Sequence, residues 1–292
     1  MKIKLAFHYG LCFGVRDALA RARRSSQEGP LTVLGELVHN PLVEEELRER
    51  GIRQGRLDDL QSSDTHQVLI TAHGASDAAR ARWKTAGFAV TDATCPLVRR
   101  AHDQLCRLVQ SGCHPVIIGK RDHVEVRGLA GDFPGASVIL DEADIFTLPR
   151  RDSYGVICQT TQPLARAEML LARLKEIFPD TRIDFCDTVC QPTKDRQHAV
   201  ETLAREVEVL VVVGGRSSNN TRQLAATAER IGCIAYHVER AEELQPRWFS
   251  GVETVGVTAG TSTLDKTVET VRARLEQFSI AQKLGTLEGT AQ

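Results

Sequence analysis

The stretch TDATCPLV, residues 91–98, joins an apolar run typical of a β-strand to a pattern typical of an α-helix, and it places Cys95 at the junction. Short β-rich runs alternate with helical patterns elsewhere in the chain, and the sequence predicts helices over 15–24, 41–50 and 77–86. Such alternation predicts parallel sheets with crossover helices. The run 209–213 is apolar throughout, as in a buried parallel strand. The sequence therefore predicts an α/β protein with mostly parallel sheets.

Two further cysteines stand at junctions of the same kind, Cys12 in GLCFG and Cys190 in DTVC. Cys95 lies 83 residues after Cys12 and 95 residues before Cys190, so each spacing is close to a third of the 292 residues. The spacing predicts three similar α/β units, although no clear residue-level repeat accompanies it. Each unit would present one thiol at the carboxyl edge of its sheet, where open α/β sheets bind ligands.

A thiol at a helix N-terminus meets unpaired N–H groups and the positive end of the helix dipole, which favours the metal-binding thiolate. The three cysteines are too far apart for a zinc knuckle and lack the local run of a bacterial ferredoxin. They could instead hold three irons of a cubane cluster and leave the fourth open, as a Lewis acid and an electron source. Cys186 is a reserve ligand. Buried thiols without a ligand role are expected at the remaining four positions, Cys106, Cys113, Cys158 and Cys233.

Polar side chains follow several other predicted strands. Histidines occur at His39, at His73 in TAHG, and at His123, two residues before Glu125. The segments 213–221 and 257–263 run from a strand into turns rich in Gly, Ser, Thr or Asn, which suit phosphate oxygens. Neither turn matches GxxxxGK[ST] or GxGxxG, so no motif supports nucleotide hydrolysis or dinucleotide binding.

Charge and composition exclude some partners. The chain has 37 basic and 38 acidic residues, which favours neither nucleic acid nor an anionic membrane as its main partner. The first residues, MKIKLAFHYGLCFG, lack the apolar core and cleavage site of a signal peptide, so a cytoplasmic location is expected. Eight cysteines in a reducing compartment favour thiols, metal ligands or redox groups over disulfides.

Taken in order, these motifs resemble the 4-hydroxy-3-methylbut-2-enyl diphosphate reductases, the last enzymes of the non-mevalonate isoprenoid pathway. The resemblance covers nearly the whole chain. It is carried by GLCFGV, GELVHNPLV, TAHGAS, DATCPLV, HVEVRGLAG, QTTQ, DTVCQPTKDRQ, GGRSSNNTRQL and GVTAGTSTLD.

The resemblance implies a trefoil of three pseudo-threefold-related α/β domains around a central [4Fe-4S] cluster, one per chain, bound by Cys12, Cys95 and Cys190. The expected domains are 13–95, 96–187, and 188–282 together with 1–12, followed by a loose tail at 283–292. The open iron would bind the allylic hydroxyl of the substrate. Electrons would come from a donor such as a ferredoxin or a flavodoxin with its reductase.

The resemblance also implies site residues. Glu125 would supply protons and Thr160 would position or relay them. The substrate, an allylic diphosphate, would lose water and gain two electrons to give isopentenyl and dimethylallyl diphosphate. Its expected ligands are His39, His73, His123, Thr160, Ser218, Asn219, Asn220 and Ser262.

The chain departs from the family pattern at a few positions. Leu11 stands where an aromatic residue is common, and Val124 replaces a proline; both concern loop shape. In RSSNNT the second phosphate serine is replaced by Asn219, whose amide can still donate to phosphate, so the ligands among residues 217–220 stay open to within one residue.

Two other functions are compatible with an open iron. A hydro-lyase would use it as a Lewis acid without net electron transfer. A cluster-based sensor would bind an effector without turnover, but Glu125 argues against this function, because a bare carboxylate would repel a diphosphate unless it carried a proton to donate.

Overall fold

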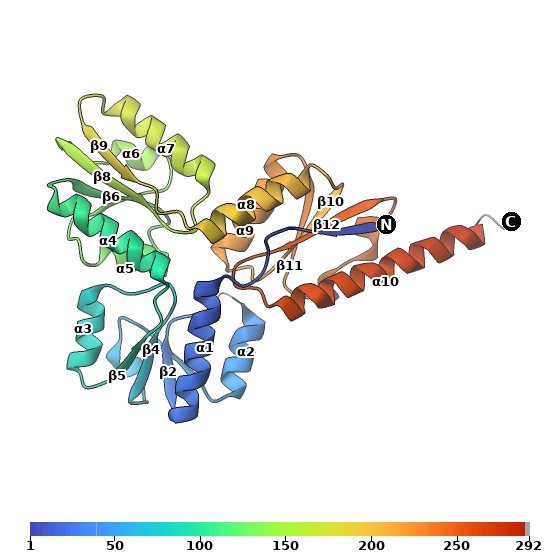
Figure 1. The fold of residues 1–292 in the computed structure, drawn as a ribbon, viewed down its shortest axis with the longest axis horizontal. Helices are drawn as coiled ribbons and strands as arrows, with labels where there is room; N and C mark the ends of the chain where they lie inside the picture. Colours follow the sequence, from blue (N-terminus) through green and yellow to red (C-terminus); the bar gives the residue numbers. More distant parts are fainter. Residues whose placement is uncertain (39, 290–292) are drawn as a thin grey trace. The chain divides into compact units, whose positions relative to one another are not determined.

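The computed structural model describes residues 1–38 and 40–289. In this part of the chain the strands form three four-stranded sheets, ordered β3-β2-β4-β5, β7-β6-β8-β9 and β11-β10-β12-β1 (Figure 1). Every pairing of neighbouring strands in these sheets is parallel. The expected α/β class with parallel sheets is confirmed.

The strands are β1 (Lys2–Leu5), β2 (Leu31–Leu34), β3 (Arg53–Gly55), β4 (Gln67–Ile70), β5 (Ala89–Asp92), β6 (His114–Ile118), β7 (Ser137–Ile139), β8 (Ser153–Cys158), β9 (Arg182–Cys186), β10 (Val209–Val213), β11 (Ile234–Val238) and β12 (Thr254–Ala259). The α-helices are α1 (Phe13–Glu28), α2 (Pro41–Glu49), α3 (Asp77–Thr85), α4 (Pro96–Gln110), α5 (Val124–Ala130), α6 (Glu142–Phe146), α7 (Leu164–Ile177), α8 (Gln191–Ala204), α9 (Asn219–Arg230) and α10 (Asp265–Gly289). Short 3₁₀ turns are η1 (Leu60–Ser62), η2 (Ala241–Glu243) and η3 (Pro246–Phe249). The helices expected over 15–24, 41–50 and 77–86 correspond to α1, α2 and α3.

All three sheets have the same strand order. When the strands of a sheet are numbered along the chain, each order reads 2-1-3-4, provided that β1 from the N-terminus counts as the fourth strand of the third sheet. In this order the connections reverse direction between the first and third strands. Loops that follow those two strands diverge, and open α/β sheets bind ligands in the crevice that results.

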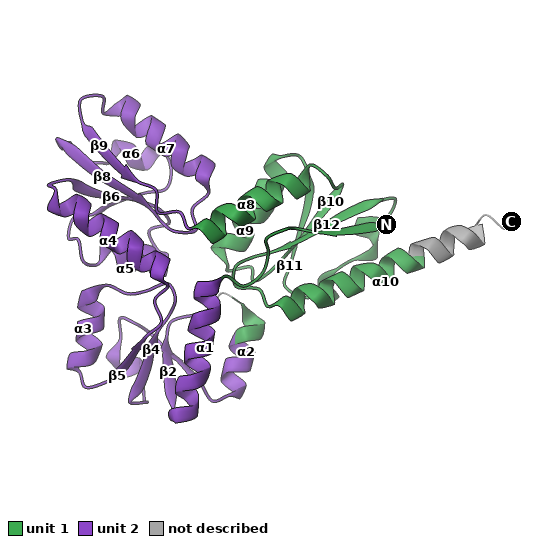
Figure 2. Cartoon of the chain, viewed as in Figure 1, with its two compact units in different colours: residues 1–12, 39–43, 191–292 green, residues 13–38, 44–190 purple. Residues whose placement is uncertain are grey.

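The chain divides into two compact units, each described here by itself (Figure 2). Unit 1 comprises Met1–Cys12, His39–Val43 and Gln191–Gln292. In its central strand β10 alternate residues face opposite sides: Val209, Val211 and Val213 belong to the core that includes residues of α10, and Leu210 and Val212 to the core that includes residues of α8 and α9. Burial on both faces explains why this strand is apolar at every position.

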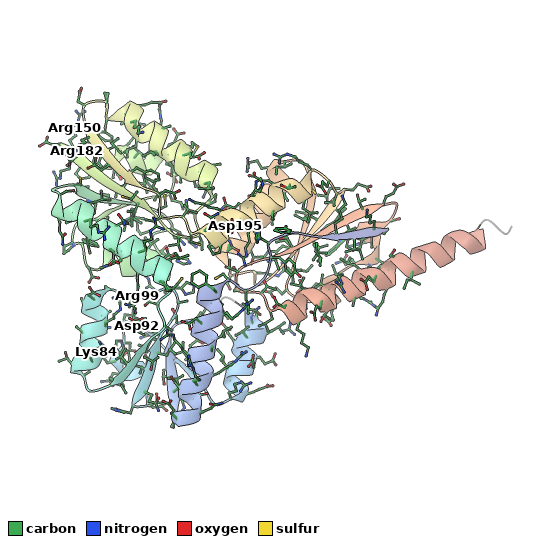
Figure 3. All side chains as sticks on the ribbon, viewed as in Figure 1. Lys84, Asp92, Arg99, Arg150, Arg182 and Asp195 are labelled. Atoms are coloured by element: carbon green, nitrogen blue, oxygen red, sulfur yellow. The ribbon has the colours of Figure 1, made fainter. Side chains whose placement is uncertain are left out.

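Unit 2 comprises Phe13–Val38 and Glu44–Cys190 and contains the other two sheets. Helix α4 buries Val98, Ala101, Leu105 and Leu108, a spacing of three or four residues that places them on one helix face. The two sheets are linked by Asp92 at the end of β5, which pairs with Arg99 of α4 at 2.8 Å (Figure 3). Within unit 2, this ion pair therefore joins a strand of one sheet to a helix that packs on the other sheet.

The expected domain boundaries at 13–95, 96–187 and 188–282 stay a prediction, because the compact units number two while the sheets number three. Helix α10 extends to Gly289, into the segment 283–292 expected to be loose. Across the described residues, no helix is both long enough and apolar enough to cross a membrane.

Candidate active site

Each of the three predicted metal-binding cysteines immediately precedes a helix. Cys12 precedes α1, Cys95 precedes α4 and Cys190 precedes α8, and each follows the fourth strand of its own sheet. The predicted strand-to-helix junctions are therefore confirmed. The even spacing of the three cysteines along the chain arises because each cysteine occupies the same position, after the fourth strand, in its own sheet.

The backbone N–H of each cysteine donates to a carbonyl in the loop after the neighbouring third strand. Cys12 donates to Thr261 O at 3.2 Å, Cys95 to Ala72 O at 3.0 Å, and Cys190 to Thr160 O at 2.9 Å. Thr261 precedes Ser262, Ala72 precedes His73, and Thr160 is itself a predicted site residue. The same hydrogen bond thus connects each thiol-bearing junction to a loop that carries a predicted substrate ligand.

The Cys95 thiol lies directly against the backbone of Gly14. A Cβ atom on Gly14 would lie 2.5 Å from Cys95 Sγ, a distance that side-chain carbons do not tolerate. Gly14 is two residues from Cys12 in the chain, and both residues belong to the motif GLCFG. The sulfur can therefore occupy this position only because residue 14 is a glycine.

Glu125 and Thr160 form a buried pair in unit 2. The Thr160 N–H donates to Glu125 Oε1 at 2.6 Å, and the Thr160 hydroxyl donates to Oε2 at 2.9 Å. Burial raises the pKa of Glu125 to about 7 from an ordinary value of 4.5, although the two hydrogen bonds from Thr160 act to lower it. A carboxyl group with this pKa can both hold and release a proton near neutral pH, as a general acid requires.

His123 caps helix α5, and its Nδ1 accepts the N–H of Glu125 at 3.2 Å. This bond assigns the proton of a neutral ring to Nε2, which makes Nε2 a hydrogen-bond donor. The His73 ring lies 5.5 Å from the His123 ring, edge to face, and Thr71 Oγ1 lies 3.4 Å from His73 Nδ1. The two histidines come from loops after strands of different sheets, and unit 2 brings them together.

In unit 1 the predicted phosphate loops share a hydrogen-bond network. The Ser262 hydroxyl donates to Ser218 Oγ at 3.5 Å, and Asn220 Oδ1 accepts the N–H of Thr261 at 3.0 Å. Because Asn220 Oδ1 accepts this backbone hydrogen bond, the Nδ2 amide is the group of Asn220 that can donate to a ligand. Ser218, Asn220 and Ser262 are all buried, as expected for side chains held in fixed orientations.

Glycines allow the two phosphate loops to approach the start of α9. Gly214 has φ +147°, and Cβ atoms on Gly214 or Gly260 would collide with the hydroxyl of Thr221. Thr221 is fully buried. Its side chain therefore fills the space that the two glycines leave.

Sequence reasoning missed Asn40 and Thr221. The Asn40 Nδ2 donates to Ser262 O at 2.8 Å, which ties the start of α2 to the second phosphate loop within unit 1. An asparagine directly before a proline-initiated helix is a local capping signal, but its partner 222 residues away is not visible in sequence. His39 lies outside the described residues, and Asn219 is the first residue of α9 and half-buried.

Three of the four cysteines expected to be buried thiols, Cys113, Cys158 and Cys233, are buried in hydrophobic cores, while the fourth, Cys106, is half-buried on α4. Cys186, the reserve ligand, is the last residue of β9 and its thiol is directed toward Gln104 Oε1 at 3.7 Å.

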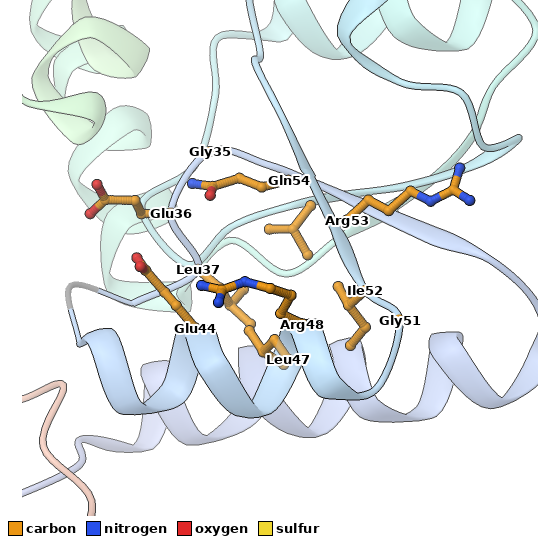
Figure 4. A pocket seen from close by; sticks show the side chains of 11 residues that line it. Gly35, Glu36, Leu37, Glu44, Leu47, Arg48, Gly51, Ile52, Arg53 and Gln54 are labelled. Atoms are coloured by element: carbon orange, nitrogen blue, oxygen red, sulfur yellow. The ribbon is translucent and has the colours of Figure 1, made fainter.

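A cavity of about 490 Å³ lies in unit 2 between α2 and the carboxyl end of β2 (Figure 4). Its walls include Leu47 and Ile52 with the charged Glu36, Arg48 and Arg53. None of the predicted site residues that the structure describes lines this cavity.

Among the described residues, three four-stranded sheets share one strand order, and in each sheet a cysteine follows the fourth strand. The fold and the site therefore place the chain in a class of α/β proteins that present thiols beside polar loops. The chain belongs to the LytB protein family, whose family model matches residues 3–276.

Curated relatives named 4-hydroxy-3-methylbut-2-enyl diphosphate reductase match nearly the whole chain. The protein of Aquifex aeolicus (strain VF5) is 33% identical over 286 residues, covering 96% of this chain and 98% of that protein. The protein of Pseudomonas savastanoi pv. phaseolicola (strain 1448A / Race 6) is 37% identical over 288 residues, covering 95% and 91%.

Two solved structures are similar to this chain. A structure described as (E)-4-hydroxy-3-methyl-but-2-enyl diphosphate reductase, the terminal enzyme of the non-mevalonate pathway, is 33% identical with a TM-score of 0.69 and covers 95% of this chain and 100% of that chain. The E-1-hydroxy-2-methyl-but-2-enyl-4-diphosphate reductase of Plasmodium falciparum is 24% identical with a TM-score of 0.86, covering 91% and 85%. The latter similarity concerns the fold alone.

Proposed function

We propose that this chain is a 4-hydroxy-3-methylbut-2-enyl diphosphate reductase that forms isopentenyl and dimethylallyl diphosphate. The hydrogen bond repeated in all three sheets carries the proposal, because it joins each cysteine to a loop with a predicted substrate ligand. The names of the curated relatives support the same activity. The reaction takes place in the cytoplasm, with electrons from a ferredoxin or a flavodoxin and its reductase.

The cofactor in this proposal is one [4Fe-4S] cluster held by Cys12, Cys95 and Cys190. The donor set fits, since thiolates are soft ligands for iron and each cysteine has the helix N-terminus that stabilises a thiolate. The close approach of Gly14 to Cys95 Sγ supports it further, because a side chain on Gly14 would displace the sulfur. When bound, the cluster supplies electrons and an iron open to a further ligand.

The predicted ligands of the diphosphate are groups that donate hydrogen bonds. In unit 2, His73 and His123 offer ring N–H groups or positive charge. In unit 1, Ser218, Asn220 and Ser262 offer hydroxyls and an amide, with Asn219 as a further candidate and His39 as a predicted ligand outside the described residues. Hydroxyl, amide and imidazolium groups match the oxygens of a diphosphate.

Glu125 supplies the protons. The C–O bond of the allylic alcohol breaks, the oxygen leaves as water, and the carbon framework gains two electrons and one proton; a second proton goes into the water. Because burial raises the pKa of Glu125 to about 7, a proton is available near neutral pH. The Thr160 hydroxyl, which touches Glu125, relays it to the substrate oxygen.

The cofactor is tested by anaerobic purification and by measuring iron and acid-labile sulfide. About four of each per chain are expected in the unchanged protein. Cys190→Ser should lose most of both, whereas Cys186→Ser, altered four residues earlier, should keep them. Zinc, or no metal, in a well-folded anaerobic sample would contradict the proposal, as would equal loss in the two variants.

The reaction is tested by turnover with a reduced dye and the allylic diphosphate. A reductase oxidises two one-electron dye equivalents for each diphosphate product formed. A hydro-lyase would release water without consuming dye, and a sensor would bind the allylic diphosphate without product. Either result with an intact cluster would replace the proposed activity.

A further inference from the structure

A separate group of potential ligands lies at the surface of unit 2. It consists of Asp77 in the first turn of α3, His102 on α4, and Asp132 in the turn after α5. One ligand atom from each residue lies within 4.8 Å of the other two. None of the three residues is a predicted cluster cysteine or a predicted substrate ligand.

Asp132 is held in place by the backbone of α3. Its Oδ2 accepts the N–H of Asp77 at 2.7 Å, and its Oδ1 accepts the N–H of Ala78 at 3.2 Å. The same Oδ2 lies 2.9 Å from His102 Nε2. Fixed orientation of a carboxylate by hydrogen bonds is typical of the outer shell of a metal site.

His102 presents its two ring nitrogens to different partners. Nε2 faces Asp132, while Nδ1 lies 3.6 Å from the thiol of Cys106, one turn further along α4. A histidine binds a metal ion through Nε2 when Nδ1 carries the proton of the neutral ring. In His102 the Nδ1–H group can donate a hydrogen bond to the sulfur of Cys106. The imidazole can therefore become a ligand without turning.

Asp77 is accessible from solvent, and its side chain is 72% exposed. In the structure it pairs with Arg80, which would have to release it for a metal ion. Arg80 has a second carboxylate partner, because its Nε lies 3.0 Å from Asp92 Oδ2. If Arg80 released Asp77, its guanidinium group would therefore still be paired with Asp92.

We propose that Asp77, His102 and Asp132 bind a divalent transition-metal ion, with Zn²⁺ as the best match. Two carboxylates and one imidazole are established Zn²⁺ ligands, and water can complete the coordination on the exposed side. The ion would connect α3, beside the β2–β5 sheet, to α4 and the α5 turn, beside the β6–β9 sheet. Its role is to hold these parts of unit 2 together.

These parts already approach closely. A Cβ atom on Gly131, at the end of α5, would lie 2.9 Å from Ser76 Cβ, the residue that caps α3. A metal ion that binds only the native arrangement stabilises it by mass action. Zn²⁺ should therefore raise the thermal unfolding midpoint and saturate at one ion per chain.

The experiment uses anaerobically purified protein with its iron content measured. The protein is dialysed against Zn²⁺, and zinc and iron per chain are then determined by mass spectrometry. One zinc per chain is expected in the unchanged protein, with its affinity lowered about tenfold or more in His102→Gln and Asp132→Asn. Asp132→Asn keeps one oxygen, which can accept one of the two α3 amides. Asp77→Asn, at an exposed position, provides a third variant that the fold should tolerate.

Asp103→Asn is the matched control, because it removes one negative charge from an exposed position next to His102 on the same helix. It should retain the zinc and the zinc-dependent rise in unfolding temperature. The proposal is overturned if the unchanged protein binds no zinc, or if His102→Gln and Asp103→Asn bind it equally. The second result would indicate zinc bound elsewhere on the surface or at the cysteines.

Discussion

At the scale of single residues, the site depends on two close contacts. Gly14 leaves room for the Cys95 thiol, and Thr160 holds the carboxyl of Glu125 through two hydrogen bonds. The first contact concerns space and the second concerns protonation. A single substitution can alter each contact, and the direction of its effect on iron content or on the pH dependence of turnover can be predicted.

Gly14→Ala should reduce the iron content while the chain stays folded. The new Cβ would displace Cys95 Sγ, since the two atoms would be 2.5 Å apart. Alanine favours a helix over glycine by about 1 kcal/mol, so a loss of iron would not reflect a weaker α1. Iron and sulfide per chain are the measurement, and Arg24→Ala, at an exposed position on the same helix, is the control. Full iron content in Gly14→Ala would show that the sulfur has room to move.

Turnover should fall as pH rises through about 7, because Glu125 then loses its proton. Thr160→Val removes the hydroxyl that lowers the pKa of Glu125, so the descending limb should move to higher pH, whereas Thr160→Ser should leave its position unchanged. Glu125→Gln should lower turnover about 100-fold or more with normal iron content. The pH profiles of the three variants test this, and an unchanged limb in Thr160→Val would be evidence against Glu125 as the titrating acid.

The same pKa has a consequence for stability. The folded chain keeps a proton on Glu125 up to pH about 7, whereas the unfolded chain releases it near 4.5. The folded state binds more protons in this window, so the contribution of Glu125 to the free energy of unfolding falls as pH rises, by at most about 3 kcal/mol. Thermal midpoints of Glu125→Gln and the unchanged protein should therefore diverge between pH 5 and 8 in favour of the variant. Parallel curves would contradict the raised pKa.

At the scale of elements, the loops after β10 and β12 pack around the start of α9. Gly214 and Gly260 approach the buried Thr221 so closely that neither has space for a side chain. These loops also carry Ser218 and Ser262, whose hydroxyls are hydrogen-bonded to each other. The packing of the two glycines against Thr221 therefore fixes both the course of these loops and the positions of Ser218 and Ser262.

Gly260→Ala should destabilise the chain by about 1–3 kcal/mol, as overpacking of a well-packed core does. Thr221→Ala removes the atom that the new methyl group meets first, although Thr221 Cβ would still lie 3.1 Å from it. The double variant should therefore lose less stability than the sum of the two single variants. Thermal unfolding and the affinity for inorganic pyrophosphate are the measurements. Strict additivity would mean that the two residues do not share this space.

At the scale of the whole molecule, three sheets repeat one strand order, and the third is completed by the N-terminal strand β1. Cys12 belongs to unit 1, whereas Cys95 and Cys190 belong to unit 2. A cluster that these three cysteines bind only in the folded chain would stabilise the folded state.

Calorimetry should then record a higher unfolding midpoint for the iron-loaded protein than for the iron-free protein. Removal of iron by a chelator should lower the midpoint, because a ligand that binds only the folded state stabilises it. Cys190→Ser should behave like the chelated protein. Identical midpoints with and without iron would argue against a cluster that binds the folded chain.

Much of the fold is predictable from local patterns. Helices α1, α2 and α3 lie where periodicity places them, and β10 is buried because its five residues are apolar. The cysteines are predictable as residues before helices, since a strand run and a helix run meet at each of them. These features depend on residues adjacent in the chain.

Contacts between distant residues are not predictable in this way. The pairing of β1 with β12, the hydrogen bond from Asn40 to Ser262 and the group formed by Asp77, His102 and Asp132 have no local signal. Ordinary capping or surface chemistry explains each residue equally well when it is read alone. Only the folded chain shows which partner each one meets.

The sequence by itself determined the α/β alternation, the three cysteine junctions and the polar loops, because propensity and hydrophobic period act over a few residues. The tertiary structure alone decided that each cysteine is hydrogen-bonded to a loop with a predicted ligand, and that Glu125 is buried with a raised pKa. The reason is physical: burial and long-range hydrogen bonds arise only when strands separated in the chain pair, and these two effects set the position and the protonation of a reactive group.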